Sequence, residues 1–297
     1  LFRPLGMART TARVSEAQAA GWPLASPHFT GPDGPEPVTI AKRDNTMHAA
    51  GGMLTTAEDL ARWLQAQLDG GRVDGRQALP EAAIRAAHTP YASFQETVWR
   101  YRRSGYGLGW NVADYEGERM LHHFGGYEGW QAHVSFLPER GIGVAVLVND
   151  NSPVGGQVPD VVATYAYDLL LGRPGLSARY AAIRDSVAER ARTARQRVRE
   201  DRERRAARPP TPDERKPFFV GSYEHPMMGR FDVELREGRL FAVMGNLLAP
   251  LDPFTRPDAL RVELGGSGQP VLFFFRDERT PADSLRLGGN VFRRRGM

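Results

Sequence analysis

The sequence of 297 residues contains no cysteine, and its only lysines are Lys42 and Lys216. The missing cysteines exclude a disulfide scaffold, a thiolate metal site and a cysteine nucleophile. Long apolar runs are missing too, because the longest, Ile142–Val148, is far shorter than the roughly 18 residues that a membrane span needs. We therefore expect no membrane span, and any catalysis must use side chains other than cysteine.

A general excess of positive charge is also absent. The formal net charge is +4, from 39 Lys and Arg against 35 Asp and Glu. Residues 184–208 alone contain ten Arg and five acidic residues, a local charge of +5, which leaves −1 for the rest of the chain. Such a basic segment could contact nucleic acid or anionic lipid. Its acids, such as Asp185 and Glu189, favour a solvated, self-paired helix instead, so we expect no nucleic-acid partner.

The first half of the chain changes character near residue 55. Residues 1–50 are rich in Pro and Gly and are predicted to be mostly loop. Thr55–Asp59 supplies an N-cap and acidic residues, apolar residues follow at helical spacing, and Gly70 ends the predicted helix. A second short helix is predicted over residues 80–88, with a proline at its start.

From Tyr106 the apolar pattern takes a period of two, which is typical of strands. Short connections between the strands imply antiparallel neighbours. The last strand is almost entirely apolar, so we expect both its faces to be covered, and an amphipathic helix over residues 158–171 follows it. This is an α+β layer arrangement. The four predicted strands are 106–112, 119–124, 131–137 and 142–149.

The C-terminal part of the chain contains two further regions. Residues 176–208 lose their apolar content and are predicted to form a charged linker helix, which a proline-rich stretch closes. From Phe218 onward strands alternate with turns, which predicts a small antiparallel barrel or sandwich. The aromatic run Phe273–Phe275 is interpreted as a buried strand, with a ligand pocket inside the barrel as the alternative.

The most informative stretch for chemistry is His122–Trp130, with the sequence HHFGGYEGW. Its three glycines let a ligand approach the backbone and leave N–H groups free to donate. A histidine beside such donors can bind an oxyanion or a carboxylate. The alternative interpretation is a glycine-rich hairpin in which the histidine only fills space.

A metal site at the same place is a weaker hypothesis. His122 and His133 can face each other across adjacent strands. However, no carboxylate or third histidine stands at a recognisable ligand spacing. We therefore expect no metal.

The stretch resembles the third motif of the serine β-lactamase and penicillin-binding protein superfamily, in its His-x-Gly form where many members have Lys-Thr-Gly. The resemblance covers residues 1–173 in consistent order and is closest to the class C-like branch, which includes esterases, D-amino-acid-releasing peptidases and β-lactamases. Residues 221–233 are similar to a lipocalin-like domain that is appended to some of these hydrolases. The other similar segments are Leu1–Met7, Ala49–Trp63, Tyr106–Trp110 and Val144–Asn149.

The resemblance implies a role for each residue of the motif. His123 would assist proton transfer or bind the polar end of the substrate, and the Gly126 N–H would be one of two oxyanion-hole donors. Gly125 would let the strand lie against the substrate, and Tyr127 would line the pocket. Because the charge of an imidazole at pH 7 is conditional, His123 favours an esterase or peptidase over a specialised β-lactamase. No metal or organic cofactor is implied.

Two other motifs of this family are absent. Its mechanism needs a nucleophilic serine three residues before a lysine, and a Tyr-x-Asn motif. Lys42 follows Thr39 and Lys216 follows Asp213 at that spacing, and none of the nine tyrosines has Asn two residues later. Thr39–Lys42 is a decoy, because it lies in a Pro- and Gly-rich loop. The family places both missing motifs upstream of the segment that matches Leu1.

We therefore expect a partial α+β hydrolase domain over residues 1–173, a charged helical linker over 174–212 and a lipocalin-like β domain over 213–297. The intact protein would hydrolyse a small-molecule or peptide substrate through an acyl-serine intermediate. Without the N-terminal half of the fold, this chain would be inactive. The alternative is a non-catalytic ligand- or peptide-binding protein on the same fold. The resemblance favours a periplasmic or secreted location, but the compartment stays open.

Overall fold

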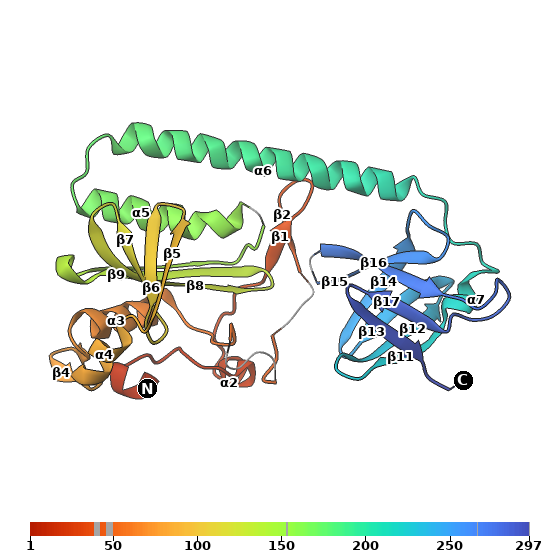
Figure 1. Ribbon diagram of the computed structural model, residues 1–297, viewed down its shortest axis with the longest axis horizontal. Helices are drawn as coiled ribbons and strands as arrows, with labels where there is room; N and C mark the ends of the chain where they lie inside the picture. The colour runs from red at the N-terminus through yellow and green to blue at the C-terminus, as the bar shows by residue number, and fades with distance from the viewer. Residues whose placement is uncertain (39–41, 46–49, 153, 266, 297) are drawn as a thin grey trace. The chain divides into compact units, whose positions relative to one another are not determined.

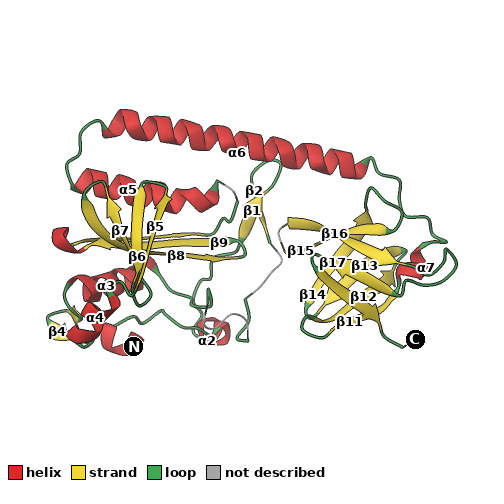
Figure 2. Cartoon of the chain, viewed as in Figure 1, coloured by secondary structure: helices red, strands yellow, loops and turns green. Residues whose placement is uncertain are grey.

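The computed structural model describes residues 1–38, 42–45, 50–152, 154–265 and 267–296. They form two compact units, the first containing most of residues 1–195 and the second most of residues 196–297. The helix α6 (Leu176–Ala206) begins in the first unit and ends in the second. The predicted class, an α+β domain followed by a small all-β barrel, is confirmed (Figures 1 and 2). The domain bounds at residues 173 and 212 stay a prediction.

The first unit is built on a six-stranded sheet with the order β10-β9-β8-β7-β6-β5. Each strand pairs antiparallel with the next one along the chain, as the short connections predicted. The strands are β5 (Ala92–Val98), β6 (Tyr101–Tyr106), β7 (Asn111–Tyr115), β8 (Glu118–Tyr127), β9 (Trp130–Leu137) and β10 (Ile142–Val148).

Helices cover both faces of this sheet (Figure 1). The helix α5 (Val158–Leu170) places Tyr167 against Met120, whereas α3 (Ala57–Leu68) places Leu64 against Leu121. Met120 and Leu121 are successive residues of β8, so they point to opposite faces. Because both helices also pack on β10, the prediction that this apolar strand is covered on both faces is confirmed.

The ends of α3 follow the sequence signals. The Thr56 hydroxyl accepts a hydrogen bond from the Asp59 N–H at 3.2 Å, which is an N-cap contact, and Glu58 and Asp59 lie in the first turn. The second predicted helix is α4 (Glu81–Ala87), and Pro80 is its N-cap.

Other parts of the first unit differ from the prediction. A strand over residues 106–112 is wrong, because Tyr106 ends β6 and β7 begins only at Asn111. The strand β5 was missed because its residues are mostly exposed and lack an apolar alternation. Thr39 of the decoy and Ala49 of a family-like segment lie outside the described residues. The N-terminal loops contain the short elements α1 (Phe2–Leu5), α2 (Val14–Ala19), β1 (His28–Thr30) and β2 (Pro35–Pro37), and a small hairpin of β3 (Arg72–Val73) and β4 (Arg76–Gln77) lies between α3 and α4.

The second unit is a closed eight-stranded antiparallel barrel, in which β11 pairs with both β12 and β18. Side chains fill its interior, including Phe231 and Phe292. Phe273 is buried and Phe274 is 45% exposed, which supports the buried-strand interpretation of that aromatic run. The elements are α7 (Lys216–Phe219), β11 (Gly221–His225), β12 (Gly229–Arg236), β13 (Arg239–Met244), β14 (Leu247–Pro253), β15 (Ala259–Gly265), β16 (Ser267–Phe274), β17 (Ser284–Leu287) and β18 (Asn290–Arg294).

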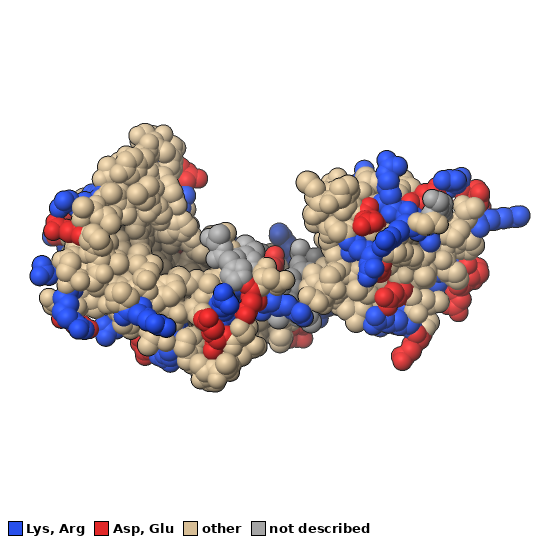
Figure 3. Space-filling model, turned by 90° about the horizontal axis from the view of Figure 1, so that it is seen from below, with Lys and Arg blue, Asp and Glu red and all other residues tan. Residues whose placement is uncertain are grey.

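The charged segments are arranged as the sequence predicted. The helix α6 has no buried residue, and its arginines pair with acids on the same helix, for example Arg192 with Glu189 at 2.5 Å. On the barrel, acidic and basic side chains are interspersed over the face that Figure 3 shows. Within the described part of the chain, no helix is both long and apolar enough to cross a membrane.

Candidate active site

One half of β8 has a strand partner on one side only. The strand β7 pairs with β8 as far as His122, whereas β9 pairs with it as far as Tyr127. Among the described strands, none lies beside residues 123–127 on the β7 side. We call His123–Tyr127 the open edge. The four residues predicted to form the site, which are His123, Gly125, Gly126 and Tyr127, all lie on it.

His123 is exposed, and both its ring nitrogens have a partner. Its Nδ1 lies 2.6 Å from the carbonyl oxygen of Phe124, and its Nε2 lies 3.2 Å from the hydroxyl of Tyr106. A carbonyl oxygen can only accept, so Nδ1 carries the hydrogen and donates it. In the neutral imidazole, Nε2 is then the acceptor and the Tyr106 hydroxyl is the donor.

The two glycines of the open edge are closely packed on the β9 side. A Cβ atom on Gly125 would lie 3.2 Å from the Cβ of Ala132, and one on Gly126 would lie 3.3 Å from the Oε1 of Gln131. A larger residue would therefore crowd β9. On the opposite side no described strand pairs with the backbone, so an extended ligand can align there by main-chain hydrogen bonds. A backbone N–H at this edge can also donate to an oxyanion.

An aromatic pair stands at the end of the open edge. The rings of Tyr127 and Trp130 stack, with centroids 5.7 Å apart and an interplanar angle of 23°. The indole Nε1 of Trp130 donates to the carbonyl oxygen of Ala25 at 3.2 Å. Burial, with a smaller contribution from Glu128, raises the pKa of Tyr127, so its hydroxyl stays un-ionised near neutral pH. The pair forms an uncharged wall beside the predicted site.

The turn after the open edge is held by an N-terminal segment. Gly129 has a φ of +84°, and a Cβ there would lie 2.1 Å from the Cβ of Pro27. The His28 N–H donates to the Gly129 carbonyl at 3.3 Å. Only glycine fits this turn, because the backbone is left-handed and Pro27 packs directly against it.

His122 points to the opposite face of β8 and is fully buried. The Nε of Arg103 donates to its Nε2 at 3.3 Å, and Arg103 also forms an ion pair with Glu96 at 2.7 Å. Burial, followed by the charge of Arg103, lowers the pKa of His122 to about 3. His122 is therefore a neutral core residue. It can be buried beside the exposed His123 because successive residues of a strand point to opposite faces.

His133 belongs to a buried polar chain between β9 and α5. Its Nδ1 lies 2.8 Å from Asp160, its Nε2 lies 2.6 Å from the Ser135 hydroxyl, and that hydroxyl lies 2.6 Å from the hydroxyl of Tyr167. The order of groups matches a catalytic triad, but Ser135 is fully buried and no substrate can reach it. Nor do the described residues contain a group of three or more side chains that could hold a metal ion.

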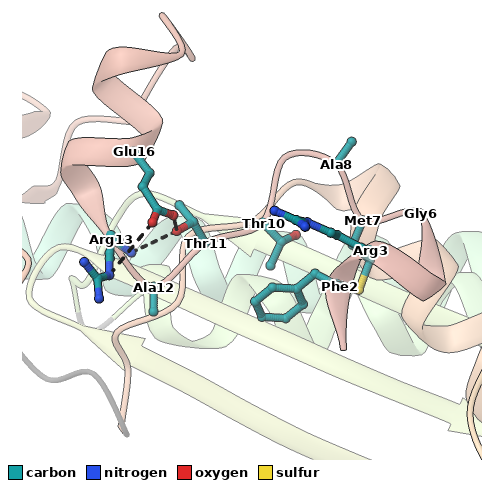
Figure 4. Close-up of a pocket in the computed structure, with 10 residues that line it drawn as sticks. All are labelled: Phe2, Arg3, Gly6, Met7, Ala8, Thr10, Thr11, Ala12, Arg13 and Glu16. Carbon is teal, nitrogen blue, oxygen red and sulfur yellow. Dashed lines mark hydrogen bonds and ion pairs between the residues drawn. The ribbon is translucent and has the colours of Figure 1, made fainter.

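A separate cavity of about 580 Å³ lies at the N-terminal segment (Figure 4). Its lining residues all fall between Phe2 and Glu16, and none comes from β8. Within it, Glu16 pairs with Arg13 at 3.8 Å and accepts a hydrogen bond from the hydroxyl of Thr11. The cavity is therefore lined independently of the open edge.

Sequence reasoning missed Tyr106 and Arg103, whose side chains form hydrogen bonds to the rings of His123 and His122. The sequence pattern predicted Tyr106 to start a strand, whereas it is the last residue of β6. No spacing in the sequence links Tyr106 to His123, since their contact depends on where β7 begins.

Comparisons with known proteins point to one family. A sequence profile described as Beta-lactamase matches residues 1–167. The unguisins hydrolase ungD' of Aspergillus campestris is 28% identical over 156 residues, which cover 50% of this chain and 27% of that protein. Penicillin-binding protein 4 of Amycolatopsis lactamdurans is 29% identical over 151 residues, which cover 50% of this chain and 39% of that protein. The chain thus spans well under half the length of these two relatives.

Among solved structures, the octameric penicillin-binding protein homologue from Pyrococcus abyssi aligns with a TM-score of 0.46 and 20% identity. The alignment covers 98% of this chain and 58% of that chain.

Proposed function

Because the chain belongs to the beta-lactamase family, which its residues 1–167 match, we propose that its first unit supplies the third-motif strand of a serine hydrolase. A serine would attack the carbonyl carbon of an ester or amide, expel the alcohol or amine, and form an acyl-serine that water then hydrolyses. The observation that carries the proposal is the open edge of β8, where His123 stands beside Gly125 and Gly126.

Each residue of the open edge takes a role in this proposal. The Gly126 N–H donates to the oxyanion, a contact that is typically worth about 10²–10³ in kcat. Gly125 lets the substrate lie along the backbone, because the strand has no neighbour there. His123 assists proton transfer or binds the polar end of the substrate. Tyr127, stacked on Trp130, lines the pocket with an uncharged ring.

The nucleophile must come from another segment, because no serine of this chain stands three residues before a lysine. We propose that a further segment supplies Ser-x-x-Lys and Tyr-x-Asn, and that the 297-residue chain is inactive by itself. The strand β10 supports this, since among the described strands it pairs only with β9. Its Leu147 is 40% exposed, and Val162 and Leu169 of α5 are exposed as well. An apolar edge of this kind is a template for another strand.

The substrate is proposed to be an ester, an amide or a peptide of the kind that class C-like esterases and D-peptidases accept. The support is the histidine at the position where many members of the family have lysine. A lysine is a permanent cation and anchors a substrate carboxylate, whereas an imidazole is charged only conditionally. The names of the two curated relatives, a hydrolase and a penicillin-binding protein, fit the same broad class.

The test is to express the reading frame together with the sequence encoded before Leu1. We expect that product to hydrolyse p-nitrophenyl acetate or D-alaninamide, and the 297-residue chain not to. Replacing the serine of the upstream Ser-x-x-Lys by alanine abolishes the activity, and His123→Ala lowers kcat. The proposal fails if no such motif is encoded upstream, if the activity ignores that serine, or if the 297-residue chain turns over substrate by itself. The first of these outcomes favours a peptide-binding role for the open edge.

A further inference from the structure

Among the described residues, the Tyr106 hydroxyl is the side-chain group that contacts Nε2 of the exposed His123. We propose that Tyr106 is a positioning residue, which fixes the ring of His123 and decides which of its nitrogens faces the reaction. The inference rests on the proposed function, because it presumes that His123 belongs to the site. The contact itself can be tested without any activity.

The position of Tyr106 follows from where the strands end. Tyr106 is the last residue of β6, and β7 begins at Asn111, which pairs with His122. The turn between them leaves no strand backbone beside His123. The backbone of Tyr106 is held from both sides, because it pairs with Asn111 and its carbonyl accepts from the Tyr91 N–H at 2.8 Å. The Tyr106 backbone is therefore fixed in a position from which its hydroxyl reaches the open edge.

The contact has two parts, a ring contact and a hydrogen bond. The rings of Tyr106 and His123 meet edge to face, with centroids 6.2 Å apart and an interplanar angle of 62°. The hydroxyl reaches Nε2 at 3.2 Å, while Nδ1 is held by the Phe124 carbonyl at 2.6 Å. Two hydrogen bonds on opposite sides of the ring prevent it from rotating. Such preorganisation matters at an active site, where a displacement of about 1 Å can cost 10²-fold in rate.

This arrangement has a consequence for the substrate. The N–H of His123 is used by the Phe124 carbonyl, and Nε2 acts as an acceptor, so the ring offers no N–H to a substrate carboxylate. Arg103 lies on the opposite face of β8, where it is tied to Glu96 and His122. The pair of Tyr106 and His123 can accept and pass on a proton but cannot anchor an anion. Substrates that end in an uncharged ester or amide are therefore preferred over those with a free carboxylate at this place.

The contact is tested by nitrogen-15 NMR of the 297-residue chain with labelled histidine. His123→Gln identifies the His123 resonances. We expect wild-type His123 to carry its hydrogen on Nδ1, with an Nε2 resonance shifted upfield by an accepted hydrogen bond. Tyr106→Phe keeps the ring and removes the donor, so the Nε2–H tautomer gains about three- to tenfold in relative population and the averaged Nδ1 resonance moves downfield. Tyr91→Phe, at an exposed tyrosine just before β5, leaves both unchanged.

A second arm avoids the substitution, in case Tyr106→Phe does not fold. Fluorotyrosine makes every tyrosine hydroxyl a stronger donor, so it should favour the Nδ1–H tautomer and move the Nδ1 resonance of His123 further upfield. If Tyr106→Phe and fluorotyrosine both leave that resonance in place, the positioning role is wrong, whatever the activity of the longer protein.

The catalytic arm uses the longer protein with its upstream sequence. We expect Tyr106→Phe to lower kcat at least tenfold with little change in KM for an ester, and to narrow the preference for the ester over a matched substrate with a free carboxylate. An unchanged kcat and preference would overturn the positioning role. If the wild-type protein shows no activity at all while the NMR contact is present, the proposed function has failed and the Tyr106–His123 contact stands.

Discussion

The two units of the molecule differ in how their interiors are built and in how their sheets end. Apart from tyrosines, every buried polar or charged side chain of the described residues lies in the first unit, between Thr10 and Asp168, and the one such tyrosine of the barrel core is Tyr223. In the barrel each strand has two neighbours. In the first unit β10 has one, and the open edge of β8 has a neighbour on one side only. Closure removes strand edges, whereas an open sheet leaves them for a ligand or another segment.

In the first unit, buried polar side chains hold the helices and strands together, whereas in the barrel the closed sheet does so. Asp168 is fully buried and accepts hydrogen bonds from Arg100 at 2.9 Å and from Tyr115 at 2.6 Å. Burial raises the pKa of Asp168, but these donors outweigh burial and the pKa is lowered overall. The network joins α5 to the turn after β7 and to the start of α6. We therefore expect loss of apolar packing to destabilise mainly the barrel, and a change in pH to destabilise mainly the first unit.

The largest effect is expected from the barrel core. Phe231→Ala removes a fully buried ring from a closed apolar interior and should lower the free energy of unfolding of the barrel by about 3–5 kcal/mol. Hydrogen exchange followed by mass spectrometry reads the barrel segments separately. All five tryptophans, Trp22, Trp63, Trp99, Trp110 and Trp130, lie in the first unit, so its unfolding is read by tryptophan fluorescence.

The matched control for the barrel is Val291→Ala, which changes a 46% exposed side chain of β18 and should cost under about 0.5 kcal/mol. If Phe231→Ala shifts the tryptophan transition as strongly as the exchange of the barrel segments, the two units do not unfold independently and the comparison fails.

The next largest effect is expected from acid, which should destabilise the first unit through His122. Its pKa is about 3 in the folded chain because it is buried beside Arg103, whereas an exposed histidine has a pKa near 6.5. Below pH 6.5 the unfolded chain therefore binds a proton that the folded chain does not, and stability is lost as the pH falls towards 3. Between pH 7 and pH 5 we expect His122 to cost the first unit about 1–2 kcal/mol, measured by denaturant unfolding with tryptophan fluorescence.

The titratable groups near His122 are Arg103, His133 and Tyr101, with His123 on the other face of the strand, and the charges of Arg103, His133 and His123 also disfavour its cationic form. His122→Gln removes its titration and should make the pH dependence of the tryptophan transition shallower; part of what remains comes from His88, whose pKa burial lowers to about 4. His225→Gln, a change in the barrel, should leave it as steep as in the wild type. A pH dependence that survives His122→Gln in full would assign the acid sensitivity to other groups.

The elements that local signals determine were the ones predicted well. Thr56 and Gly70 bracket α3, and the pattern of β8, β9 and β10 gave their pairing, because capping and hairpin turns depend on neighbours in sequence. The strand β5 was missed since its pairing with β6 decides it and its residues face solvent. His123 was found from its glycine neighbours, but Tyr106 was not, because their contact arises from the position of a strand end 17 residues away.

The smallest effect is expected at the N-cap of α3, and it tests whether this cap stabilises the helix that covers the open sheet. The Thr56 hydroxyl is the N-cap acceptor of α3, which packs on β10. Thr56→Ala leaves the Asp59 N–H without that acceptor and should cost the first unit about 1 kcal/mol, while Thr56→Ser, which keeps the acceptor, should cost much less. The barrel, which contains none of α3, should keep its hydrogen-exchange protection in both variants. Equal losses in both variants would mean that the methyl packing of Thr56 matters and the cap does not.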